Sequence, residues 1–209
     1  MNPRDDIIPA TSSFIEENVG ELVQVFHEVA SSDDLHIDIH HGRSPGDVRY
    51  QWLFTSGMSR KPMNVPVGCD ANPFAELMMC LPAEWPLTAD RFREENNYWP
   101  VRLLKMLARY PHENNTWLCG GHSVSHGKAF AANTKMSSVI LLQPQLLGAE
   151  PTVHVRGEEV LLWAVCPLYE EERAYKQARG SEALTKLLAN RGINELLNPA
   201  RPCVLSRVI

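Results

Sequence analysis

The sequence has no CxxC pair, no long apolar run and no excess of basic residues. Its five cysteines are an odd number scattered along the chain, so we expect neither a disulfide framework nor a zinc ribbon. No apolar stretch approaches the roughly 20 residues that span a bilayer. The N-terminal MNPRDDIIPATSS lacks the basic start and apolar core of a signal peptide. We therefore expect a cytoplasmic protein in a reducing compartment, without membrane attachment.

The overall charge argues against a general nucleic-acid binder. The formal net charge is −5, whereas binding to phosphate backbones requires a basic face. The chain also has no Gly-, Ser- or Pro-rich linker and no internal repeat over its 209 residues. We expect one domain covering residues 1–209, with 193–209 as a C-terminal tail.

The N-terminal half predicts one helix followed by strands. Residues 12–32 have apolar positions near a 3.6-residue period, and Ser13 with Glu16 resembles a capping box. Residues 35–41, LHIDIHH, alternate and predict a half-exposed strand whose polar face carries His36, Asp38 and His40. Residues 48–57 predict its hairpin partner, and the nearly continuous apolarity of 74–81 predicts a buried strand.

The C-terminal half alternates between helices and strands. A helix is predicted over 97–110, and strands are predicted at 116–119, 137–142 and 160–168. Helices follow within 168–190, with Gly180 as a C-cap and Glu172 placed to pair with Lys176 one turn later. These elements predict an α+β fold in which helices pack against a mixed sheet.

The stretch CGGHSVSHGK, residues 119–128, combines residue types that occur in several kinds of site. It does not fit a phosphate-binding loop, because Gly121 and Gly127 are separated by five residues and Ala129 follows Lys128. His122 and His126 could share a zinc ion only if the loop bends, since four extended residues separate backbones by roughly 13 Å. Further ligands could come from the histidines or the aspartate elsewhere in the chain, namely His36, His40, His41, His112 or Asp38.

A catalytic interpretation of the same stretch would use Cys119 as a nucleophile beside His122. The sequence shows no cation or helix N-terminus that would stabilise a thiolate there, and it contains no GxSxG elbow. We therefore assign no catalytic residue, metal or cofactor. A metal-dependent or Cys/His hydrolase that uses residues 119–128 remains the alternative.

A second unusual segment, TSGMSRKPMNVP, begins at Thr55. We interpret Met58 and Met63 as residues that fill gaps in the core, with Arg60 and Lys61 on a solvated turn. The alternative is that the methionines form an adaptable contact surface.

The order of several motifs resembles the Suppressor of fused family. These motifs are HIDIH, TSGMSRKPM, AELMMCLPAEWP, YWPVRLLKMLARYPHENNTWLCGGH and VCPLYEEERAYKQARGSEALTKLL, and the resemblance covers about residues 12–190. It implies the α/β sandwich of that family's N-terminal domain, with a mixed and mostly antiparallel sheet packed by helices.

The resemblance also implies a surface that binds a protein or peptide partner. Animal members hold a short peptide strand of a transcription factor between two domains, and the segment from Ala108 to His126 resembles part of that edge. Tyr110 matches a tyrosine of the family's partner surface, and His122 and His126 resemble a spaced histidine pair. We expect partner-binding residues at Tyr110, Gly120, Gly121, His122 and His126.

Gly121 stands where the family has an acidic residue, so partner chemistry does not transfer intact. The chain resembles the short, single-domain bacterial form of the family. Several such members are thought to act as immunity proteins, which implies a non-enzymatic antitoxin that neutralises a partner toxin.

Overall fold

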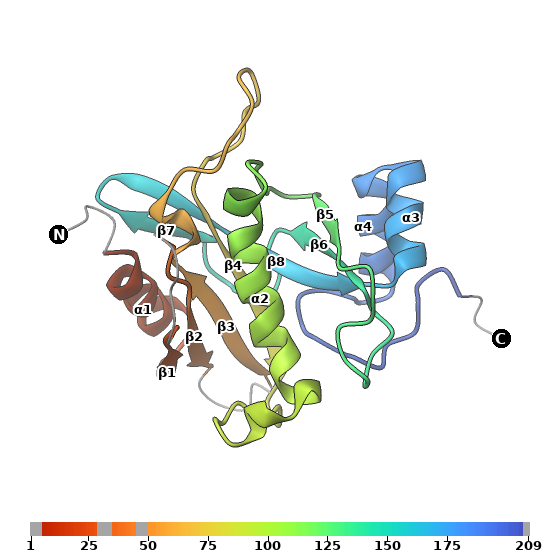
Figure 1. The fold of residues 1–209 in the computed structure, drawn as a ribbon, viewed down its shortest axis with the longest axis horizontal. Helices are drawn as coiled ribbons and strands as arrows, with labels where there is room; N and C mark the ends of the chain where they lie inside the picture. The colour runs from red at the N-terminus through yellow and green to blue at the C-terminus, as the bar shows by residue number, and fades with distance from the viewer. Residues whose placement is uncertain (1–5, 29–34, 45–49, 207–209) are drawn as a thin grey trace.

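The fold is one mixed sheet covered by helices on both faces (Figure 1). The computed structural model describes residues 6–28, 35–44 and 50–206. Within these residues the sheet has eight strands in the order β1-β2-β3-β4-β8-β6-β5, and β7 pairs with β8 beside this path. Every pairing is antiparallel except that of β4 with β8, which confirms the predicted mixed, mostly antiparallel sheet.

The helices and strands have the following bounds. The strands are β1 Glu21–Phe26, β2 Asp38–Arg43, β3 Tyr50–Ser56, β4 Ala75–Pro82, β5 Ser123–Ser125, β6 Ser138–Leu142, β7 Thr152–Val155 and β8 Glu158–Leu168. The helices are α1 Ile7–Asn18, α2 Glu95–Glu113, α3 Glu170–Arg179 and α4 Ser181–Asn190, with short 3-10 turns at Met58–Arg60 and Arg91–Arg93.

The central strand β4 is nearly all apolar because helices cover both of its faces. Its odd-numbered residues Leu77, Met79 and Leu81 join the core that includes the apolar face of α2. Met78 and Cys80 face the opposite way, into the core beneath α1. A strand buried on both sides loses the alternation of polar and apolar residues, so the prediction of a buried strand near 74–81 is confirmed.

The two faces of the sheet carry different helices. Helix α2 crosses one face, and α1 and the α3–α4 pair cover the other, at opposite ends of the sheet (Figure 1). Leu184 and Leu188 of α4 pack with Cys166 and Leu168 of β8. This arrangement places α3 and α4 beside β6 and β5, where the strand order ends.

The predicted helix over residues 12–32 is confirmed only for 12–18 and is wrong from residue 19 to the end of the described segment at 28. Helix α1 ends at Asn18, Gly20 takes φ 140°, and the chain then enters strand β1. The predicted cap residue Ser13 therefore lies inside α1. ELVQVF, residues 21–26, is rich in β-branched and aromatic residues, and pairing with β2 overrides the helical period that continues from α1. The remainder of the predicted helix, 29–32, lies outside the described residues.

The predicted half-exposed strand near 35–41 is also corrected. The strand β2 begins at Asp38. Of the three side chains expected on its solvent face, Asp38 and His40 are fully buried, whereas His36 precedes the strand and is 28% exposed. Helix α1 covers this face, and Ser12 Oγ lies 3.3 Å from His40 Nδ1. The hairpin with β3 is confirmed, although its turn at 45–49 lies outside the described residues.

Two further strand predictions change. Residues 116–119 are not a strand, because this segment connects α2 to the turn before β5. Strand β7 was not predicted; it precedes a tight turn at Arg156 and Gly157, both with positive φ, and pairs with the first part of β8. The predicted break between the last two helices is confirmed at Gly180, which has φ 89°.

The methionines of TSGMSRKPM belong to the core, as predicted. Met58 is fully buried and Met63 is 4% exposed. Beneath the same turn, the buried carboxylate of Glu76 accepts hydrogen bonds from Thr55 and from Ser59 through both its N–H and its hydroxyl. Burial raises the pKa of Glu76, and these donors fix the turn to β4.

The C-terminal segment contributes to the packing, although no structure was predicted for it. Leu197 and Val204 are buried, and Glu195 accepts the backbone N–H groups of Gln145 and Leu146 at 2.7 Å. Among the described residues, no helix combines the length and hydropathy that a membrane crossing requires.

Candidate functional site

Strand β5, in the middle of the stretch 119–128, is the outermost strand on its side of the sheet. The carbonyl of His122 accepts the N–H of Leu141 on β6 at 2.9 Å, and the N–H of His126 donates to the carbonyl of Ser137, the residue before β6, at 2.8 Å. In an antiparallel ladder, alternate residues point their backbone groups toward the partner strand. Ser123 and Ser125 therefore point their N–H and C=O groups away from β6. No other strand in the described part of the chain pairs with this side of β5.

The side chains of β5 hold the strand in place. Lys176 Nζ on α3 donates to Ser123 Oγ at 3.1 Å, and Ser125 Oγ donates to Glu170 Oε2 at 3.4 Å. Hydrogen bonds from Arg173 lower the pKa of Glu170, which keeps this acceptor ionised. Val124 points the other way and packs against the core beneath α2. The outward backbone groups are thus carried on a strand that is fixed on both faces.

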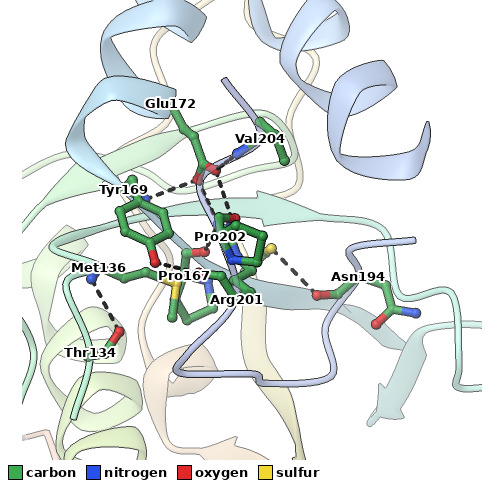
Figure 2. Close-up of polar contacts among 10 residues, drawn as sticks. Thr134, Met136, Pro167, Tyr169, Glu172, Asn194, Arg201, Pro202 and Val204 are labelled. Carbon is green, nitrogen blue, oxygen red and sulfur yellow. Dashed lines mark hydrogen bonds and ion pairs between the residues drawn. The ribbon is translucent and has the colours of Figure 1, made fainter. Parts of the chain in front are cut away.

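Helix α3 is itself anchored by a buried ion pair (Figure 2). Glu172 Oε1 and Oε2 accept from the two terminal nitrogens of Arg201 at 2.7 and 2.6 Å, and the side chains are 0% and 7% exposed. The same carboxylate accepts the N–H of Tyr169 and of Val204, and Arg201 also donates to the carbonyl of Pro167. This network joins α3, the end of β8 and the C-terminal segment.

The predicted pair of Glu172 with Lys176 is therefore wrong. Glu172 points into the protein toward Arg201, 29 residues later, while Lys176 reaches Ser123. Local spacing on a helix identifies possible neighbours, but a buried carboxylate requires a buried cation and several donors, which only the folded C-terminal segment supplies.

Gly120 and Gly121 form the turn that leads into β5. A Cβ at Gly120 would lie 2.7 Å from the ring of Trp163 on β8, so a side chain there would collide with the indole. Gly121 has φ 80°, a conformation that other residues rarely adopt, and a Cβ would lie 3.1 Å from Ser181 Oγ. Glycine is required at both positions because the backbone of this turn passes close to β8 and α4.

The rings of His122 and His126 contact different neighbours at the two ends of β5. His122 lies edge-on to Trp117 with 5.3 Å between ring centroids, and His126 lies 5.4 Å from Phe130. Burial lowers the pKa of His122, so its ring is neutral at pH 7. A strand between them separates the two rings, and this arrangement does not bring them to one metal ion.

Cys119 does not have the environment of an activated nucleophile. Burial raises the pKa of its thiol, whereas a reactive cysteine has a lowered pKa. Its sulfur lies 3.7 Å from the carbonyl of Gly120.

Tyr110 lies in the last turns of α2, and its half-buried ring packs against the main core together with Trp117 and Val124. The segment that follows α2 leads directly to β5, so the end of this helix and the edge strand lie on the same side of the molecule (Figure 1). The predicted site residues thus divide into a half-buried aromatic, a glycine turn and two residues that flank an exposed edge.

Comparison with known proteins connects this geometry to a family. The profile of the Suppressor of fused protein (SUFU) family matches residues 33–202. Among solved structures, a Suppressor of fused homologue from Neisseria gonorrhoeae FA 1090 is 14% identical, with a TM-score of 0.68 and 100% of both chains covered.

Two further structures share the fold. A chain of the Sufu–Fu complex is 15% identical with a TM-score of 0.65, and the match covers 97% of this chain and 92% of that one. Drosophila Suppressor of Fused is 16% identical with a TM-score of 0.65, and the match covers 97% of this chain but 51% of the Drosophila chain. No curated protein sequence gives a significant match. At such identities the structural likeness shows the fold alone.

Proposed function

The chain belongs to the Suppressor of fused family, and from this premise we propose that it is a non-enzymatic module that binds a protein partner through the edge of β5. The observation that carries the proposal is the outward orientation of the backbone groups of Ser123 and Ser125. An extended partner segment can add to such an edge by main-chain hydrogen bonds. One family structure was solved as a Sufu–Fu complex, which supports protein binding as the activity.

The backbone of β5 and the side chains around it have different roles in the proposed recognition. Strand addition provides affinity through the backbone, and neighbouring side chains provide selectivity. We propose that Tyr110, His122 and His126 contact the partner, and that Gly120 and Gly121 form the turn beside it. Since Gly121 offers no counter-charge, recognition relies on shape and backbone pairing rather than on a basic partner residue.

We further propose that the partner is a toxin and that the chain acts as its immunity protein in the cytoplasm. An immunity protein has to bind tightly and needs no catalytic turnover. The rigidly held edge of β5 suits tight binding, and the raised pKa of the Cys119 thiol suits a protein that does not use this cysteine as a nucleophile. The test is co-expression of the chain with toxin genes from its own genomic neighbourhood. Rescue of growth by the wild-type chain supports this role. Binding to a toxin without rescue of growth would contradict the immunity function while leaving protein binding intact.

Hydrogen exchange tests the edge directly. In the free protein, the amides of Ser123 and Ser125 are expected to exchange fast, while those of Val124 and His126 are protected by β6. On complex formation with a partner captured from the source cells, the two serine amides should become protected. Protection confined to another surface would contradict strand addition at β5.

Paired variants separate the backbone from the side chain. Ser125→Pro removes the outward N–H without removing a bond to β6, and edge positions tolerate proline. Binding should weaken about tenfold or more, since a hydrogen-bond donor is lost and the ring obstructs pairing. Ser125→Ala keeps the N–H and should bind like the wild type. Equal binding by both variants would refute the role of this edge.

A further inference from the structure

A second group of polar side chains lies at the opposite end of the sheet, where β1 is followed by residues leading into β2. His27 Nδ1 lies 3.0 Å from Asp38 Oδ2, and His36 Nε2 lies 2.9 Å from Asp38 Oδ1. One ligand atom from each of the three residues lies within 4.8 Å of the other two. The group is far in the sequence from the stretch 119–128 and plays no part in the proposed partner-binding edge.

The strand register brings these residues together. Phe26, the last residue of β1, pairs with Ile39 of β2, so continuing the register by one position brings His27 opposite Asp38. Opposite residues of antiparallel strands have Cβ atoms about 4.5–5.5 Å apart. His36 precedes Asp38 by two positions, which returns its side chain to the same face of an extended chain. The pairing of the two strands therefore brings the three potential metal ligands together without a bound ion.

The distances match what one transition-metal ion requires. Bonds of about 2.0–2.1 Å to nitrogen and oxygen place ligand atoms about 2.9–3.4 Å apart for bond angles between 90° and 109°. The two His–Asp distances, 3.0 Å from His27 to Oδ2 and 2.9 Å from His36 to Oδ1, lie at that limit but involve different oxygens, so a shared ion would be bound by both oxygens of the carboxylate. The ring of His27 is 67% exposed and can turn to close the remaining distance to His36.

The buried carboxylate of Asp38 favours a bound cation, and two basic residues of α2 lie near it without being directly bonded to it. Its side chain is 1% exposed, and beyond the two imidazoles its oxygen Oδ1 accepts the N–H of Glu28 at 3.0 Å. Arg109 on α2 is bonded to the carboxylate of Glu28. Burial lowers the pKa of Lys105 on α2, and the charges of Glu28 and Asp38 partly oppose this shift. A divalent ion would give the buried carboxylate a directly bonded counter-charge.

We propose that His27, His36 and Asp38 form a binding site for a divalent transition-metal ion of the zinc type. Two imidazole nitrogens and one carboxylate suit zinc and related ions, whereas calcium and magnesium prefer oxygen ligands alone. Three protein ligands leave a coordination position open, and the exposed ring of His27 places that position toward solvent. The bound ion joins the end of β1 to the start of β2.

The experiment titrates ZnCl2 into untagged protein from which metals have been removed with a chelator, followed by calorimetry. We expect one equivalent of zinc to bind, and an excess of Mg²⁺ or Ca²⁺ not to compete. His27→Ala and His36→Ala should each weaken binding at least tenfold. His154→Ala is the matched control, because His154 is an exposed histidine on β7, and it should bind zinc like the wild type.

Two further measurements keep the outcome unambiguous. Co²⁺ should give visible d–d absorption that the His27→Ala variant loses, which distinguishes coordination by the ring from a general effect on stability. The double variant His122→Ala/His126→Ala should retain binding. Absence of saturable zinc binding, unchanged binding in both single variants, or loss of binding in that double variant would overturn the proposal.

Discussion

The two outermost strands of the sheet, β1 and β5, are protected from unwanted pairing in different ways. Strand β1 has a bulge between Leu22 and Gln24, and Gln24 Nε2 donates to the carbonyl of Leu87 at 2.9 Å. Phe26 packs on Phe92, so the segment around 87–92 contacts β1 through two side chains. Strand β5 has a regular register and spans only Ser123–Ser125.

Bulges and covering segments prevent edge-to-edge association, and so does a very short strand. A short strand that is regular and rigidly held still offers a template for one extended segment, whereas a bulged strand does not. The difference between β1 and β5 therefore supports the proposal that a partner binds at β5, while the proposed metal site lies at the other end of the sheet. Four predictions test this contrast, from the largest expected effect to the smallest.

Removing the buried cation beneath α3 should have the largest effect. Arg201→Met leaves the carboxylate of Glu172 buried without its partner, which we expect to reduce the free energy of unfolding by about 3–5 kcal/mol. Hydrogen exchange should increase first in α3 and β5, while β1 and β2 remain protected. Denaturant unfolding and exchange measure both effects.

Two controls accompany this variant. Arg179→Met removes an exposed arginine of α3 and should change stability by no more than about 0.5 kcal/mol. Glu172→Leu combined with Arg201→Met should recover part of the loss, because no charge is then left unpaired. Equal loosening of β1 and β5 in Arg201→Met would show that the two ends of the sheet do not unfold independently.

Acid should act mainly at the β1–β2 end. Burial lowers the pKa of His40 and of His41 to about 4, below the value of about 6.5 expected in the unfolded chain. The unfolded state then binds more protons between these values, so stability is complete above pH 6.5 and falls as pH decreases toward 4. Each histidine contributes a slope of up to about 1.4 kcal/mol per pH unit.

Urea unfolding at pH 7, 6 and 5 measures this slope, and His41→Gln should make it shallower. His41 is suited to the test because its Nε2 has no hydrogen-bond partner in the described structure. A slope that is the same in the variant and in the wild type would mean that other groups cause the acid sensitivity.

Tyr110→Ala should weaken partner binding by about 1–3 kcal/mol, the range of aromatic residues at interface centres. Because the ring is half-buried against the main core, some stability will be lost as well. Tyr110→Phe keeps that packing and should restore most of the binding. Calorimetric titration together with thermal unfolding separates the two effects, and a variant that unfolds without a specific loss of affinity would assign the ring to the core.

The smallest effect is expected on β1. Val23 lies at the bulge and is 37% exposed, so Val23→Lys should change the free energy of unfolding by no more than about 0.5 kcal/mol and leave partner binding intact. Thermal unfolding and the same titration measure both quantities. Loss of binding in this variant would reverse the assignment of the two edges.

Several elements could be predicted from local sequence patterns, because their own residues dictate their place in the fold. The run near 74–81 and the run 160–168 are too apolar for any position but the centre of a sheet, and the helix around 97–110 has a sustained helical period. Gly180 separates the last two helices because its positive φ suits a helix end. These features arise from local periodicity and backbone sterics.

Other features depend on residues that are distant in the sequence, and these could not be predicted before the folded arrangement was known. Residues 21–26 became a strand because β2 was available for pairing, and His40 is buried beneath α1, where Ser12 contacts it. The partner of Glu172 is Arg201, beyond the reach of any helical spacing. Likewise, Ser123 and Ser125 became an exposed edge only because the strand order ends at β5. Side-chain patterns reveal a local preference, but the choice of neighbour is made by packing across the whole chain.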